Sequence, residues 1–401
     1  MTPSETLDRS AWRNGLSLIL LIWLLTGTLY RQADPNTRHD GELWSSLAAS
    51  KLIKSHQSEY ANGYAASPLP VVTLRPLAKI DPIWVNDCWH AVCVLCMIAA
   101  IGFFCLAAEI KPNHAAAICI LFVTGFTYRP TLFDFQSGDL DLPVLALLCG
   151  GFMADRFGRG YRLATCIALA ALIKLWLIAL LVYLIFRRRI VPLIWGLILF
   201  SGCMAALFAR VGWRELPALG HVALQWTSKD YGYDFSNQSL LGFARVHFGP
   251  NASAEPLLAD PILLYGFVSI GLLAILIGLT IAFRADKSWE MPKRRMCLCM
   301  TLVSLLLICP ISRQPSFVLL LPAVWTLLVC DGVPGISRLI AALAFVLLTD
   351  PFSAAHPSTS GWQSLAYSAF FFAAVLVWLA LLLAITRRQK RDVYIFEPAW
   401  D

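Results

Sequence analysis

The sequence predicts an all-α polytopic integral membrane protein. Of its 401 residues, 58% are hydrophobic and 14% are charged, and the mean hydropathy is +0.66. Soluble domains carry about 25% charged residues, and several apolar runs here approach the ~20 residues that cross a bilayer as a helix. We expect about ten full spans, one short helical hairpin, and an amphipathic interfacial helix in the first outer loop.

The apolar runs give the expected spans in order along the chain. The first follows Arg9 and Arg13, and no small-residue cleavage site comes after it, so we expect a retained helix rather than a removed signal peptide. Most of the 12 cysteines lie inside apolar runs, as small buried residues do. The expected spans lie near 15–31, 85–107, 115–127, 140–154, 190–209, 261–283, 296–311, 316–330, 336–349 and 364–386.

The run from Leu163 to Phe186 is apolar except for Lys174 near its middle, and arginines flank both ends. If this run crossed the membrane once, the basic clusters at 284–295 and 387–391 would face outward, against the positive-inside rule. A hairpin keeps both clusters in the cytoplasm. Its legs of about 18 Å fall short of the ~30 Å hydrocarbon core, so Lys174 either lies at the tip and lines a cavity or snorkels along one helix.

Polar sequence gathers in four outer loops, expected at 32–84, 128–139, 210–260 and 311–316. In the first loop, apolar residues recur at helical spacing and predict an amphipathic helix in the outer interface; they are Leu43, Trp44, Leu47, Ala48 and Leu52. We expect one transmembrane domain over 1–391 and a short cytoplasmic tail over 392–401. The expected location is the inner (cytoplasmic) membrane, with both termini in the cytoplasm.

Carboxylates gather at the outer boundary of the predicted membrane region. They are Asp34, Asp40, Glu42, Asp134, Asp139 and Asp141. Lys174, Arg245 and Arg313 supply the opposite charge. A carboxylate can take a proton from a hydroxyl group, and cations can stabilise a departing phosphate. The layout therefore favours a reaction on a lipid-linked phosphate. The sequence has no Gly-rich phosphate loop, nucleotide-binding fold or paired Cys/His metal site, which disfavours a soluble nucleotide-sugar donor.

Four motifs occur in a particular order. "DGELWSSLAASKLIKSHQSEY" begins at Asp40, and "SPLPVVTLRPLAKI" follows it. The third is a long block from "FQSGDLDLP" through Lys174 to "FRRRIVPLIW", and the fourth is "NQSLLGFAR". Over roughly 13–330, the chain resembles glycosyltransferase family 87. These membrane enzymes of the GT-C class include polyprenyl-phosphate-mannose-dependent mannosyltransferases and related arabinofuranosyltransferases.

The resemblance implies a GT-C-like bundle and a hexosyltransferase. Its donor would be a mannose-like hexose or a pentose on polyprenyl phosphate, and its acceptor a glycan or glycolipid on the periplasmic or outer face. Asp40 would be the catalytic base, and Lys174 and Arg245 would bind the donor phosphate. The residues implied in sugar or acceptor binding are Asp139, Asp141, Asn237, Gln238 and Ser239. Glu42 and Arg313 are further candidates.

Other interpretations stay open at this stage. Lys174 can instead form an internal ion pair with Asp139 or Asp141, and the chain can be a transporter or flippase of a lipid-linked or anionic solute. A relative that has lost activity is a third interpretation, because family members often carry an aromatic residue and histidines where this chain has "RQPS" at 313–316. We expect membrane lipid as a partner, no nucleic acid and no cofactor, with a divalent metal left open.

Overall fold

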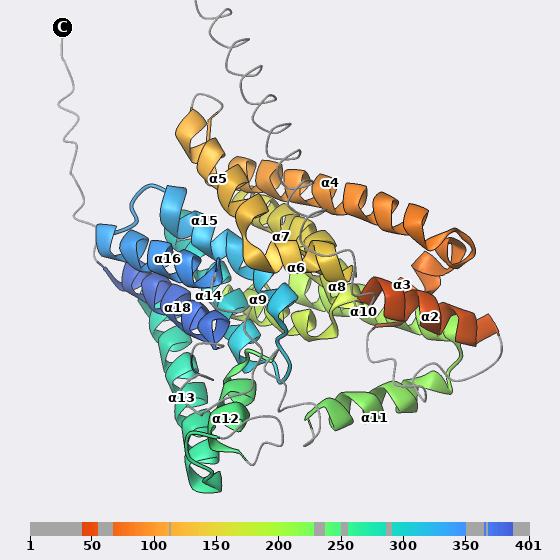
Figure 1. Ribbon diagram of the computed structural model, residues 1–401. Helices are drawn as coiled ribbons and strands as arrows, with labels where there is room; N and C mark the ends of the chain where they lie inside the picture. The colour runs from red at the N-terminus through yellow and green to blue at the C-terminus, as the bar shows by residue number, and fades with distance from the viewer. Residues whose placement is uncertain are drawn as a thin grey trace, which may run out of the picture.

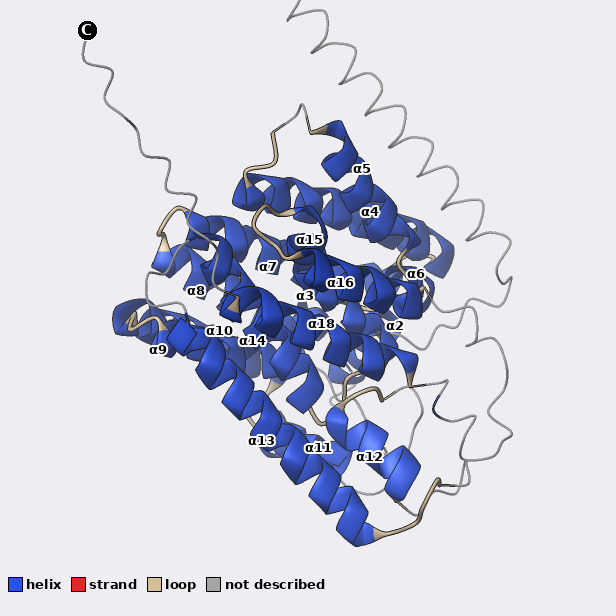
Figure 2. Ribbon diagram, turned by 90° about the vertical axis from the view of Figure 1, so that its left-hand side faces the viewer, coloured by secondary structure: helices blue, strands red, loops and turns tan. Residues whose placement is uncertain are grey.

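The computed structural model describes residues 42–54, 67–111, 114–227, 237–249, 256–285, 291–349, 365 and 368–387. Within these residues the fold is helical, with one isolated antiparallel bridge between Asn237 and Arg313. The helices pack as one bundle, in which α4 and α5 lie on the side opposite α13 (Figure 1). Helix α13 runs along one edge, with α12 packed beside it (Figure 2).

The described helices follow one another along the chain, and the short 3-10 helices among them carry the letter η. They are α2 (Glu42–Lys54), α3 (Pro68–Leu74), η2 (Arg75–Lys79), α4 (Pro82–Ala108), α5 (Ala115–Thr127), α6 (Arg129–Ser137), α7 (Asp141–Arg156), α8 (Gly160–Ile173), η3 (Leu175–Leu181), α9 (Val182–Phe186), α10 (Ile190–Val211), α11 (Glu215–Thr227), α12 (Leu240–Phe248), α13 (Pro261–Ala285), α14 (Met291–Ile308), η4 (Gln314–Leu320), α15 (Leu321–Val329), α16 (Gly335–Leu348) and α18 (Ala369–Thr386).

The prediction of an all-helical membrane protein is confirmed, but the prediction of about ten full spans is confirmed only in part. Four described helices are long and apolar enough to cross a membrane, namely α4, α10, α13 and α18. A fifth span results if α5 and α6, which meet at a bend of 47°, count as one. The expected span at 15–31 lies outside the described residues.

Several expected spans instead form shorter helices inside the bundle. The run at 316–330 divides into η4 and α15, and every residue from Leu321 to Leu327 is buried by protein. By contrast, Ile262 and Ile270 of α13 are 80% and 70% exposed, as lipid-facing side chains are. Apolar runs of this reduced length are typical of core helices, so hydropathy alone overstates the number of spans.

The apolar run around Lys174 reverses direction, as the charge pattern predicts. Helix α8 ends at Lys174, whose backbone is extended (φ −117°, ψ 95°), and η3 and α9 lead back. The two open ends meet where the Arg189 guanidinium donates to the Gly158 carbonyl at 3.1 Å. Helix α8 has 14 residues, or about 21 Å of length. Lys174 therefore lies at the tip of a short helical hairpin.

Two expectations for the outer loops need correction. The expected amphipathic helix forms as α2 and buries Leu43 and Leu47 as predicted, but it also buries Ser46 and Ser50 and exposes Ala48, so its buried face matches the predicted apolar face only in part. The cause is that α2 packs onto α3 and η2 of the same chain. The expected loop at 128–139 is mostly helix α6, which ends at Gly138 in the left-handed region with φ 74°.

Candidate active site

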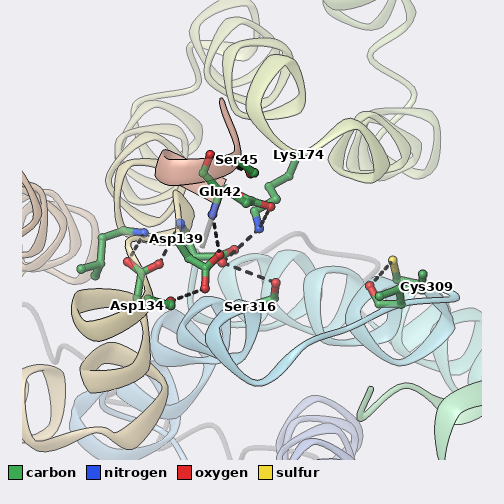
Figure 3. Close-up of polar contacts among 11 residues, drawn as sticks. Glu42, Ser45, Asp134, Asp139, Lys174, Cys309 and Ser316 are labelled. Carbon is green, nitrogen blue, oxygen red and sulfur yellow. Dashed lines mark hydrogen bonds and ion pairs between the residues drawn. The ribbon is translucent and has the colours of Figure 1, made fainter. Parts of the chain in front are cut away.

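Lys174 lies at the hairpin tip between two carboxylates from distant parts of the chain. Its Nζ is 2.6 Å from Glu42 Oε1 and 3.1 Å from Asp141 Oδ2, and its side chain is only 11% exposed. Figure 3 shows Glu42 and Lys174 turned toward each other above Asp139 and Ser316. The hairpin tip is thereby attached to the first turns of both α2 and α7.

Asp134 fixes the start of α7 by accepting hydrogen bonds from its first backbone amides. Its Oδ1 accepts a hydrogen bond from the Asp141 amide at 3.2 Å, and its Oδ2 accepts one from the Leu142 amide at 3.0 Å. The first amides of a helix have no partner inside the helix, and a carboxylate there also interacts favourably with the helix dipole. Asp134 is fully buried, so it positions the turn that carries Asp141.

Asp139 holds the start of α2 in the same way. Its Oδ1 accepts a hydrogen bond from the Glu42 amide at 3.3 Å, and its Oδ2 accepts one from the Ser137 hydroxyl. The Leu43 amide donates to the Gly138 carbonyl at 2.9 Å. The turn after α6 therefore fixes where Glu42 enters the cluster.

Two carboxyl oxygens of the cluster are buried and have no hydrogen-bond partner among the described residues. They belong to Glu42 (Oε2) and Asp141 (Oδ1). Burial raises the pKa of Glu42 above its ordinary 4.5, and the Lys174 charge acts in the opposite direction. Because a buried polar oxygen without a partner is costly, both atoms are suited to accept a hydrogen bond from a substrate hydroxyl.

The Asn237-Gln238-Ser239 motif is buried and bonded to the segment before η4. Asn237 Nδ2 donates to the Pro310 carbonyl at 2.9 Å, and Asn237 Oδ1 accepts from the Ser312 amide at 3.1 Å. Ser239 caps α12 by accepting from the Gly242 amide, and Gln238 Oε1 accepts from the Phe371 amide. These contacts favour a positioning role for the motif. A direct role in sugar or acceptor binding stays a prediction.

The remaining predicted site residues are not joined in one place. Arg245 is half-buried on α12, and Arg313 is exposed and paired with Asn237 through the antiparallel bridge. Asp40, the predicted catalytic base, lies outside the described residues, two positions before Glu42. The predicted roles of all three stay predictions.

Sequence reasoning gave too little weight to Asp134 and Ser316. Ser316 Oγ lies 3.5 Å from Asp141 Oδ2, in the stretch 313–316 where relatives were expected to carry an aromatic residue and histidines. Asp134 precedes Asp141 by seven residues with the Gly138 turn between them, a spacing that allows a carboxylate to fold back onto the next helix. Among the residues that the structure describes, no group of three or more His, Cys, Asp or Glu is placed to hold a metal ion.

A comparison with protein-family models identifies the class of this chain. The model of glycosyltransferase family 87 matches residues 66–310. The chain belongs to glycosyltransferase family 87. The family match includes Asp139, Asp141 and Lys174 but neither Glu42 nor Arg313, so it is shorter than the resemblance predicted from the motifs. No curated protein matches the chain in a direct sequence comparison.

Family 87 membership and the helices together identify a multi-pass membrane glycosyltransferase. The family as matched specifies a sugar transfer and leaves the donor and the acceptor open. Within the matched region, Lys174 supplies a buried cation, and Asp141 supplies a carboxyl oxygen that has no partner among the described residues. We therefore take this cluster as the candidate active site of the family 87 chain.

Proposed function

We propose that the chain transfers a mannose-like hexose or a pentose from a polyprenyl-phosphate donor to a glycan or glycolipid acceptor. The reaction takes place on the outer face of the cytoplasmic membrane, and both termini lie in the cytoplasm. The observation that carries the proposal is the buried Lys174 ammonium at the hairpin tip, held between Glu42 and Asp141. Family membership supports the sugar transfer, and the charge pattern of the sequence supports the orientation.

Lys174 is suited to the donor phosphate by its unused bonding capacity. A lysine ammonium has three N–H donors, and the two carboxylates of Glu42 and Asp141 accept two of them. The third donor reaches a phosphate oxygen of the donor, with Arg245 as a second cation. When the bond from the sugar anomeric carbon to the phosphate oxygen breaks, negative charge develops on that phosphate, and preorganised donors stabilise it.

A carboxylate receives the proton of the acceptor hydroxyl while the new glycosidic bond forms. Asp40 is the proposed base, by the resemblance of its motif to the family. Glu42 is the second candidate, because its Oε2 is buried and has no partner among the described residues. The proton goes to the carboxylate and the electron pair of the broken bond goes to polyprenyl phosphate, so the step balances without a further reactant.

The remaining predicted residues act on the sugar or the acceptor. Asp141 Oδ1 has no partner among the described residues and is suited to accept a bond from a sugar hydroxyl, whereas Asp139 fixes α2. Asn237 and Ser239 keep the segment around Arg313 in place, since their side chains bond to backbone atoms of Pro310 and Ser312. Gln238 bonds to the Ser312 carbonyl through its backbone amide, and its side chain bonds to α18. In this proposal Arg313 is the exposed residue of that segment that meets the acceptor.

The test compares Asp40→Asn, Glu42→Gln and Lys174→Met in purified protein supplied with polyprenyl-phosphate sugars. Asp40→Asn should abolish transfer, and Lys174→Met should lower it by about 10²–10³, as loss of one charge-stabilising donor does. The control is Glu109→Gln, which removes an exposed carboxylate paired with Arg156 at the other end of α7. Full transfer by Asp40→Asn with none by Glu42→Gln would reassign the base.

The sugar and acceptor are identified by mass spectrometry of envelope glycans and lipid-linked sugars from cells with and without the protein. In cells without the protein, we expect a glycan that lacks one sugar, together with accumulation of the sugar-carrying lipid donor. If the protein instead moves lipid-linked sugar across vesicles without covalent transfer, the transporter alternative replaces this proposal.

A further inference from the structure

A second cluster of charged side chains lies at the far end of α7 from Lys174. Helix α7 has 16 residues, about 24 Å of length, and it begins at Asp141 in the candidate active site and ends at Arg156. Around its last turn gather Arg156 of α7 itself, Arg187 from the hairpin base, and Arg294 and Arg295 from the start of α14. None of these side chains has a part in the proposed sugar transfer.

The centre of this cluster is Asp155, which is only 4% exposed. Its Oδ2 lies 2.7 Å from Arg294 Nε and 3.4 Å from Arg187 Nη1, and it accepts a hydrogen bond from the Tyr183 hydroxyl at 3.1 Å. One carboxylate thus faces two guanidinium groups. The buried part of the cluster carries an excess of positive charge.

A pocket opens beside this carboxylate, and its wall contains three arginines and one aspartate. Its enclosed space is about 10 Å³, room for one water-sized group such as a phosphate oxygen, and its mouth is open to the surface. The lining residues are Phe152, Asp155, Arg156, Arg294, Arg295 and Leu298. Phe152 and Leu298 give the wall an apolar part beside the charges. The charge of the wall is positive even when Asp155 is fully ionised.

Arg294 provides an independent sign of a missing ligand. The residue is 9% exposed, and its Nη2 is buried without a hydrogen-bond partner among the described residues. A buried guanidinium N–H without an acceptor is costly. The two neighbouring arginines of the wall are already oriented, because Arg295 donates to the Ala107 carbonyl and Arg156 pairs with Glu109 at 2.8 Å.

We propose that this pocket binds the phosphate group of an anionic phospholipid. Guanidinium groups match phosphate oxygens in geometry and form charge-assisted hydrogen bonds with them. Basic pockets between helices at the membrane boundary take anionic lipid head groups in this way. The lipid phosphate supplies an acceptor for Arg294 Nη2, which has none among the described residues. The site is separate from the proposed sugar transfer and does not depend on it.

The test is retention of phosphatidylglycerol against phosphatidylcholine by the purified full-length protein, measured by native mass spectrometry without any sugar donor. We expect preferential retention of phosphatidylglycerol and a higher melting temperature in its presence. Arg294→Gln should weaken this lipid binding by about tenfold, the effect of one lost charged hydrogen bond. Arg156→Gln, whose side chain is 24% exposed, should weaken it as well and carries less risk of unfolding.

The matched control is Arg338→Gln, which removes an arginine that bonds to the Cys330 carbonyl and does not line the pocket. It should retain phosphatidylglycerol as the unaltered protein does. Equal retention of the two lipids, or equal weakening by Arg338→Gln, would overturn the proposal. Millimolar inorganic phosphate that stabilises the protein as well as the lipid does would show that the source is free phosphate, which also overturns the lipid assignment.

Discussion

Lys174 places one positive charge among four carboxyl groups, which divide into two pairs with different tasks. Asp134 and Asp139 accept backbone amides and so fix α7 and α2. Glu42 and Asp141 bond to the ammonium and each keep one oxygen without a partner. The division separates carboxylates that build the site from those available to a substrate.

Protonation of Glu42 should make stability depend on pH. Burial raises the pKa of Glu42 above 4.5, so the folded protein holds this proton more tightly than the unfolded chain. The resulting stabilisation is fully present below pH 4.5 and is lost as the pH rises through the raised pKa. Glu42→Gln should therefore remove part of the loss of melting temperature between pH 4.5 and neutrality. Superimposable curves for the two proteins would contradict this expectation.

At the scale of elements, the turn after α6 decides where α2 meets the site. Gly138 has φ 74°, and a Cβ there would lie 3.3 Å from Trp44 Nε1 and 3.4 Å from Leu43 Cβ. Only a residue without a Cβ combines this backbone conformation with so close an approach. The contact of α2 with α6 therefore depends on one glycine.

Gly138→Ala should destabilise the protein by more than Gly158→Ala does. Gly158 has a similar φ of 70°, but a Cβ there would meet nothing within 4 Å. Both substitutions force alanine into the left-handed region, at roughly 1–2 kcal/mol, and only the first also pushes against α2. The comparison is made by thermal unfolding, and sugar transfer should fall further in Gly138→Ala. Equal losses would show that the approach of α2 adds nothing.

The helical class and the hairpin were predictable because they rest on composition and charge, which act over many residues. The break at Lys174 follows from a single charge in an apolar run with arginines at both ends. The short buried helices η4 and α15 were not predictable, because an apolar run that faces lipid and one that is buried by protein have similar compositions. The contact of Asp134 with the start of α7 was not predictable either, because it depends on the turn at Gly138. The hydrogen bonds of Asn237 were not predictable, because its partners lie some 75 residues away in the sequence.

For the whole molecule, the charge difference between the two ends of α7 supports the proposed orientation in the membrane. The Lys174 cluster and the Asp155 cluster lie at opposite ends of α7, and the hairpin returns the chain to the Asp155 end at Arg189. The positive-inside rule assigns the end richer in arginine to the cytoplasm. Under this assignment the candidate active site faces outward, as the proposed function requires.

Cysteine labelling tests this orientation through α10, which begins beside the hairpin base. Ile190→Cys, at a position 48% exposed, should resist a membrane-impermeant thiol reagent added to intact cells and react once the membrane is permeabilised. The matched control is Trp213→Cys, at a 57% exposed position just past the other end of α10, which should react from the outside. Because the chain has its own exposed Cys88, a Cys88→Ser background is needed. Labelling of position 190 from the outside would contradict the proposed orientation, because it would place the arginine-rich Asp155 end outside, against the charge rule.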